Sequence, residues 1–171
     1  MYCGGASFCP LTPVVCGTQV LLTTPTAIVA FDQATGSLRW TFNGSFVGAY
    51  HQPACHPSGM MVVMDGDATL VAFQAVGTLV SELWRRSTGA FHVVRAPVID
   101  AVGNVYVIGG AVMSDTNPAK LLAFDHVGNL LISRSINVPP SAATAPQYMS
   151  QPVLLRDRIV VGVGELVSFF P

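Results

Sequence analysis

One segment occurs three times along this 171-residue chain, and it constrains the fold more than any other feature. The first copy, residues 28–40, is an apolar run, a tight turn that contains Asp and Gly, and a second run that ends in tryptophan. Residues 70–79 and residues 121–130 repeat the apolar run and the glycine turn. Copies that begin about 40 to 50 residues apart indicate one β supersecondary unit repeated along the chain.

The repeated segment belongs to a longer unit that opens with a proline and apolar residues. A turn and a β-branched strand follow each proline, and no run of ten or more residues shows a helical period with proper caps. Three or four short strands in about 40 residues predict a β-propeller blade. We therefore expect an all-β chain, a partial β-propeller of about three to four blades, each blade a four-stranded antiparallel sheet. The expected units of this single propeller segment are about 11–50, 51–94, 95–138 and 150–171, with a linker at 138–149.

Composition narrows the possible partners. The chain is 51% hydrophobic and only 10% charged, against about 25% charged in an average globular domain. This balance favours strands that are buried on both faces, or a surface that other protein covers. The net charge is −1 and the eight basic residues are scattered, which argues against nucleic acid as a partner. The apolar runs are far shorter than the roughly 18 residues that a transmembrane helix needs, and no signal peptide is visible.

All four cysteines, Cys3, Cys9, Cys16 and Cys55, lie in the first third of the chain. A disulfide near the amino terminus and unpaired thiols are both open interpretations. Unpaired thiols are favoured, because neither the pairing nor the compartment can be read from the sequence.

The first copy of the segment resembles the repeat of the PQQ-like family of tryptophan-docking β-propellers, which reads Ala-x-Asp-x-x-Thr-Gly-x-x-x-Trp. Ala30, Asp32, Thr35, Gly36 and Trp40 match every position. The later copies are degenerate, since Gln replaces the Asp in the second and Ile stands near the tryptophan position in the third. The later copies keep Ala72, Gly77 and a late Trp84, and then Ala123, Asp125 and Gly128.

The motif has a physical reason that does not depend on the family. Asp32 can accept hydrogen bonds from amides two and three residues further on, and Gly36 can take a positive φ. Ala30 is small on the face shared with the next blade. The resemblance implies that the rings of Trp40 and Trp84 lie against a glycine turn of a neighbouring blade, where they join the blades.

The resemblance also bears on catalysis, because the family includes quinone-dependent dehydrogenases. These enzymes hold calcium and PQQ with acidic ligands, a catalytic Asp and often adjacent cysteines. Most carboxylates here flank turns, which leaves Asp115, Glu82 and Glu165, whereas calcium needs six to eight oxygens. Asp65 and Asp67 fit a hairpin turn better than a metal loop. His51, Cys55 and His56 are the only metal-like cluster and lack a fourth ligand. We therefore predict no catalytic, cofactor-binding or metal-binding residue and no cofactor, and we lean against an enzyme.

The leading functional hypothesis is a non-catalytic β-propeller scaffold or accessory subunit that contacts other proteins in a larger assembly. Expected partners are subunits that cover an open propeller edge, and association with a membrane complex stays open. One alternative is a fragment of a PQQ-dependent dehydrogenase whose catalytic blades lie elsewhere, and a weaker one is a sugar- or lipid-binding propeller. The resemblance slightly favours an exported or lumenal location. The expected partner-binding residues lie in the polar insertion at 110–120 and at the apolar end, namely Met113, Asp115, Asn117, Phe169 and Phe170.

Overall fold

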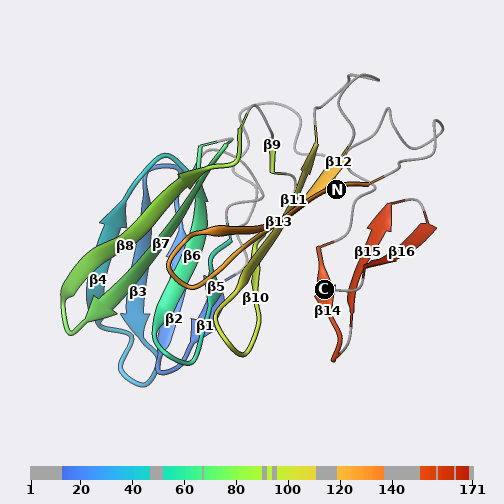
Figure 1. Ribbon diagram of the computed structural model, residues 1–171. Helices are drawn as coiled ribbons and strands as arrows, with labels where there is room; N and C mark the ends of the chain where they lie inside the picture. The colour runs from blue at the N-terminus through green and yellow to red at the C-terminus, as the bar shows by residue number, and fades with distance from the viewer. Residues whose placement is uncertain are drawn as a thin grey trace, which may run out of the picture.

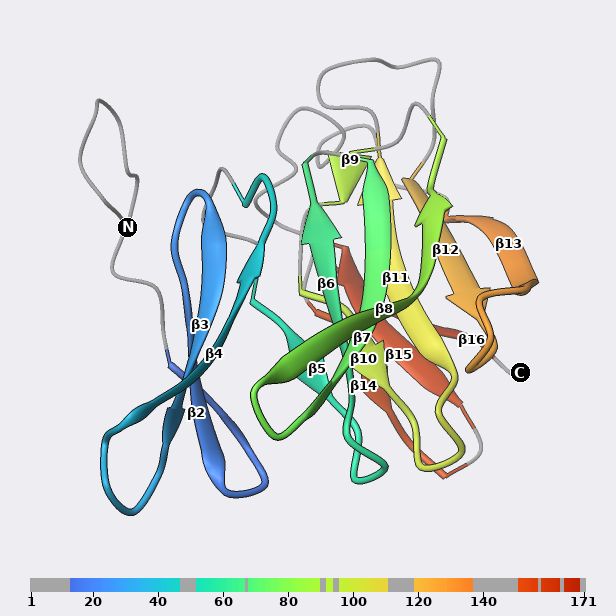
Figure 2. The same ribbon diagram turned by 90° about the vertical axis from the view of Figure 1, so that its left-hand side faces the viewer.

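The computed structural model confirms an all-β propeller architecture. It describes residues 13–46, 52–66, 68–89, 92–93, 96–110, 119–136, 151–156, 158–163 and 165–169. These residues form sixteen strands in four antiparallel sheets, and none of them belongs to a helix that could cross a membrane. The sheets stand side by side as successive blades, shown from blue to red in Figures 1 and 2.

Each sheet is a simple meander, with neighbouring strands paired in chain order. Blade 1 contains β1 (Val14–Cys16), β2 (Gln19–Thr23), β3 (Ala27–Asp32) and β4 (Leu38–Asn43). Blade 2 contains β5 (Ala54–Cys55), β6 (Met60–Asp65), β7 (Thr69–Val76) and β8 (Leu79–Ser87). Blade 3 contains β10 (Val98–Ile99), β11 (Val105–Gly110), β12 (Ala119–Phe124) and β13 (Leu130–Ile136), and β9 (His92–Val93) pairs with the end of β11. Blade 4 contains β14 (Val153–Leu154), β15 (Ile159–Val163) and β16 (Glu165–Phe169).

The repeated alanine occupies the same place in three blades. It lies on the third strand of the meander and pairs with the second, and the register to the fourth strand shifts immediately after it in each blade. Such a bulge bends the strand and increases its twist. The shared register defines equivalent positions from blade to blade. The alanine pairs are Leu21 with Ala30, Val62 with Ala72, and Tyr106 with Ala123.

The hydrophobic core lies between blades rather than inside any one of them. Side chains alternate between the two faces of a sheet along each strand. Each blade therefore presents one apolar set forward, toward the next blade in the chain, and another backward, toward the preceding blade. Between blades 1 and 2 the core contains Leu21, Ile28, Ala30 and Trp40 against Met61, Val63, Val71 and Phe73. Between blades 2 and 3 it contains Val62, Met64, Leu70, Ala72 and Trp84 against Val105, Val107, Leu122 and Phe124. Between blades 3 and 4 it contains Ile108, Leu121, Ala123 and Ile136 against Ile159 and Val161.

One apolar sheet face has no neighbouring blade among the described residues, and we call it the open face of blade 1. Its members are Val20, Leu22, Val29 and Phe31, which are equivalent to Met61, Val63, Val71 and Phe73 of blade 2. The blade 2 residues are at most 5% exposed, because blade 1 covers them. On the open face, Leu22 is 36% exposed and the other three are half-buried.

A disulfide joins Cys16 of β1 to Cys55 of β5, with their Cα atoms 5.7 Å apart. The interpretation of the cysteines as unpaired thiols is therefore wrong for this pair, and Cys3 and Cys9 lie outside the described residues. The two cysteines are 39 residues apart, close to one repeat. One repeat brings the first strands of neighbouring blades together, which is the physical reason for the bond.

Candidate functional site

The complete motif forms a tight turn between β3 and β4 around the carboxylate of Asp32. One carboxylate oxygen accepts hydrogen bonds from the amides of Ala34 (3.0 Å) and Thr35 (2.8 Å), and the other pairs with Arg39. The bond from Arg39, together with those from Thr35, lowers the pKa of Asp32 to about 2. Gly36 takes a φ of 69°, which closes the turn. The carboxylate that most resembles a catalytic acid is therefore fully engaged in holding a turn.

Blade 3 contains two more aspartate turns with a shared five-residue pattern that the sequence analysis did not single out. Residues 100–104 and 125–129 each read Asp, any residue, Val, Gly, Asn. In both, one Asp oxygen accepts the amides two and four residues further on, at 2.7 to 3.0 Å, while the Asn side chain donates to the other oxygen. The repeated Asp-to-Asn spacing is the signal that could have revealed this turn.

Trp84 lies where the resemblance implies, against a glycine turn of the next blade. A Cβ added to Gly128 would be 2.8 Å from the indole ring, so only glycine fits beneath it. The indole nitrogen donates to the carbonyl oxygen of His126 at 2.9 Å, and the ring stacks on Phe124. This one side chain therefore fixes blade 2 to blade 3 by a hydrogen bond and by ring contact.

Trp40 contacts the next blade in a different way. Its indole nitrogen donates to Gln19 of its own blade at 2.7 Å, and the ring meets Phe73 of blade 2 edge-on. Apart from its two chain neighbours, no described residue has an atom within 4 Å of the Cβ position at Gly77, the glycine against which the resemblance implies that the ring should lie. Blade 2 has Gln74 where the motif has Asp, and its strands continue to a two-residue turn. The stack on glycine therefore forms at only one of the two tryptophans.

The metal-like residues near the first strand of blade 2 are engaged in structural contacts. His56 Nδ1 lies 2.8 Å from the Ser58 hydroxyl and His56 Nε2 lies 3.2 Å from the Ala101 carbonyl oxygen, while Cys55 is in the disulfide. His51 lies outside the described residues. Within the described ranges, no three His, Cys, Asp or Glu side chains gather closely enough to hold a metal ion.

The remaining carboxylates of blade 2 form an ion-pair cluster with one arginine. Arg85 bridges Asp65 of β6 and Glu82 of β8, and Asp65 also accepts the amide of Ser45 at 2.6 Å. These contacts join strands, and they raise the pKa of Arg85. Phe169 ends β16 and Glu165 begins it. The other predicted residues, Asp67, Met113, Asp115, Asn117 and Phe170, lie outside the described part of the chain.

An apolar surface lies at one end of the blades. This end carries the turn between the first and second strands of each blade and, in blades 1 to 3, the turn between the third and fourth strands. A meander places these turns at the same end, as Figure 2 shows for blades 1 and 2. Large apolar side chains flank them and are between 50% and 74% exposed. We call this surface the turn face, and its apolar members are Val15, Leu38, Val76, Leu79, Val102, Val127, Leu130 and Leu155.

The four meanders with cores between them define a segment of a β-propeller. No protein-family model and no curated protein sequence matches the chain. Among solved structures, BamB from Moraxella catarrhalis, a β-propeller of the PQQ-like type, is similar with a TM-score of 0.63 and 14% identity over 92% of this chain. A protein of unknown function from Bacteroides caccae has a TM-score of 0.59 and 16% identity over 85% of this chain. The chain spans 41% of BamB and 50% of the Bacteroides protein.

Proposed function

We propose that this chain is a non-catalytic β-propeller scaffold whose turn face binds other proteins in a larger assembly. The observation that carries the proposal is the collection of exposed apolar side chains on the turn face. Single exposed apolar residues are ordinary, but apolar side chains gathered on one surface are typical of a protein contact. Covering this surface with a partner protein would remove exposed apolar area from water, in a chain that has only 10% charged residues.

Hydrogen bonds to aspartates hold three of the turns that carry these side chains. Val102 and Val127 each lie inside an aspartate turn, and Leu38 follows the Asp32 turn. A surface that is already ordered loses little conformational entropy when a partner binds. The aspartates with lowered pKa values hold these turns, so their shifts reflect turn structure rather than a reacting acid or base.

Site-specific photo-crosslinking in cells that naturally produce the protein tests this proposal. Benzoylphenylalanine at Val76 or Val102 should give discrete light-dependent adducts with one or a few proteins, identified by mass spectrometry. Thr41, which is exposed on β4 away from the turns, is the matched control position and should give none. The absence of adducts from both turn-face positions, or the same adducts from Thr41, would overturn the role of the turn face.

A second measurement addresses catalysis. Purified protein supplied with PQQ and calcium should show no dye-linked oxidation of alcohols or sugars above the rate without protein. Saturable oxidation would overturn the non-catalytic part of the proposal and support the dehydrogenase alternative.

A further inference from the structure

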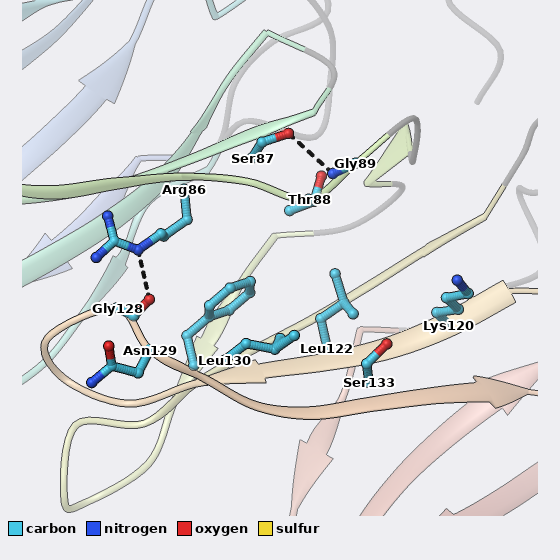
Figure 3. Close-up of a pocket in the computed structure, with 11 residues that line it drawn as sticks. Arg86, Ser87, Thr88, Gly89, Lys120, Leu122, Gly128, Asn129, Leu130 and Ser133 are labelled. Carbon is cyan, nitrogen blue, oxygen red and sulfur yellow. Dashed lines mark hydrogen bonds between the residues drawn. The ribbon is translucent and has the colours of Figure 1, made fainter.

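A groove lies between blades 2 and 3, where their outer strands meet. Its cavity has a volume of about 470 Å³, within the usual range of roughly 300 to 1,000 Å³ for ligand sites. One wall is the end of β8 and the residues after it, and the other wall and the floor come from β12, β13 and the turn between them. Figure 3 shows Leu122 and Leu130 in the middle of the groove, with Arg86 toward one end and Lys120 toward the other.

The charged side chains that line this groove in the described part of the chain are all positive. Arg86 and Lys120 line it, and none of its described lining residues is a carboxylate. Arg39 and Arg85 are both paired with acidic side chains, whereas no Asp or Glu in the described ranges forms an ion pair with Arg86. Carbonyl oxygens hold its guanidinium instead, since Nε donates to Gly128 at 2.7 Å and Nη1 donates to Arg85 at 2.8 Å. Arg86 is thus fixed in position, and no described carboxylate pairs with its positive charge.

The strands that border the groove offer backbone as well as side-chain contacts. Among the described residues, β8 pairs only with β7 and β13 pairs only with β12, so each has an edge without a strand partner. The unpaired amides and carbonyls of an edge strand can bind an extended peptide, and pockets beside the edge select its side chains. Hydroxyls of Ser87 and Ser133 add polar contacts on the two walls.

We infer that this groove binds an extended peptide segment of a partner protein, with apolar residues at the centre of the segment and Asp or Glu at its ends. The apolar residues fit the floor formed by Leu122 and Leu130, and the carboxylates face Arg86 and Lys120. The inference deepens the proposed scaffold role and depends on it, but it assigns a second surface that shares only Leu130 with the turn face.

Fluorescence anisotropy with the full chain tests the inference. The probe is a labelled peptide of about six residues, the usual length of a strand, with leucines at its centre and aspartates at its ends. The matching peptide with asparagines should bind at least about tenfold more weakly, because charge complementarity is lost. Arg86→Gln should weaken binding of the acidic peptide by about tenfold, as expected for the loss of one charged contact. Ser133→Trp, which fills the groove without removing a charge, should abolish binding.

Arg85→Gln is the matched control. It removes the same charge at the neighbouring residue, but Arg85 does not line the groove. Its effect should stay within about twofold. Equal losses with Arg85→Gln and Arg86→Gln, equal binding of the two peptides, or undiminished binding to Ser133→Trp would each overturn the inference. If Arg86→Gln fails to fold, judged by circular dichroism, the comparison of the two peptides and Ser133→Trp still decide the outcome.

The two proposals fail separately. If the peptide does not bind but photo-crosslinks from Val76 still form, the groove is overturned as a peptide site and the turn face still stands as a contact surface. If the peptide binds but no turn-face crosslinks form, the groove is supported as a peptide site and the turn face is overturned as a contact surface. Competition by inorganic phosphate as strong as by the unlabelled peptide would indicate an anion site rather than a peptide site and would also overturn the inference.

Discussion

Asp32, Asp100 and Asp125 have the same role in three different turns. Each carboxylate accepts amide hydrogens from residues a short distance along the chain. Burial alone would raise the pKa of Asp100, but bonds from Asn104 and Tyr106 outweigh it and lower the pKa. The ionised form is therefore the one that the folded turns require.

Replacing Asp32 with asparagine should lower stability at neutral pH and remove a pH dependence. The pKa of Asp32 is lowered to about 2 in the folded protein, below its ordinary value of 3.8. A depressed folded-state pKa stabilises the fold above the unfolded-state value, and this contribution disappears as the pH falls toward 2. Urea unfolding should show the largest difference between wild type and Asp32→Asn above pH 4, with convergence near pH 2. Glu82→Gln, on the exposed face of β8, serves as the control, and a pH-independent difference for Asp32→Asn would contradict the expectation.

Two glycine substitutions separate backbone strain from ring contact. Gly77 and Gly128 both have positive φ angles, 63° and 85°, but only Gly128 lies beneath the ring of Trp84. Gly77→Ala should cost about 1 kcal/mol of unfolding free energy from strain alone. Gly128→Ala should cost about 2 to 4 kcal/mol, because the added methyl group also displaces the indole. Equal costs in urea unfolding would show that the ring contact contributes nothing.

The two kinds of motif residue differ in how far a sequence can predict them. The Asp32 turn depends on bonds to residues two and three positions away, so its geometry follows from local spacing. The position of Trp40 depends on the shape of a turn in the next blade, where Gln74 and a two-residue turn replace the aspartate turn. A family pattern read at Trp40 alone contains no information about that distant turn.

At the scale of the strands and blades, the repeat period predicts the architecture well, and the all-β propeller fold is confirmed. Apolar runs bounded by Gly, Pro and Asp are sufficient to predict strands, because each run faces a core on one or both sides. A disulfide near the amino terminus is one of two open interpretations of the sequence, but the pairing of Cys16 with Cys55 depends on which strands of neighbouring blades lie together. Once the period is known, the 39-residue separation of Cys16 and Cys55 becomes informative.

Removing the disulfide should destabilise the contact between the first strands of blades 1 and 2. For a loop of this length, the chain-entropy model gives about 4 kcal/mol. The double change Cys16→Ala with Cys55→Ala should therefore lower the urea midpoint, and dithiothreitol should lower the midpoint of the wild type but not that of the double variant. Labelling of Cys16 by iodoacetamide in unfolded, unreduced protein would contradict the disulfide.

At the scale of the whole molecule, equivalent positions in neighbouring blades show which blade surfaces are buried in a propeller. The chain has apolar side chains at the same four positions in blade 1 as in blade 2, although only the blade 2 set is buried by a described neighbour. A sequence pattern reports that these positions are apolar. It does not report which blade or partner lies over them.

Equivalent lysine substitutions in blades 1 and 2 test the open face directly. Val63→Lys places an unpaired charge in the core between blades 1 and 2 and should cost about 3 to 5 kcal/mol of unfolding free energy. Leu22→Lys introduces the same charge at the equivalent, partly exposed position and should cost less than about 1 kcal/mol. Urea unfolding of the two variants provides the comparison. A similar loss at both positions would mean that the face of blade 1 is covered in the folded chain.

The open face of blade 1 also has a consequence for symmetry. It repeats the backward-facing surface of blades 2 and 3, so its natural complement is the forward-facing surface of a blade, not a second open face. Contact between two copies through this surface would therefore be heterologous, head to tail, and not the isologous two-fold contact of most dimers. Heterologous contacts close into rings when the rotation between units divides a full turn, and otherwise extend as filaments. The rotation from each blade to the next would thus also decide whether such an assembly closes into a ring or grows as a filament.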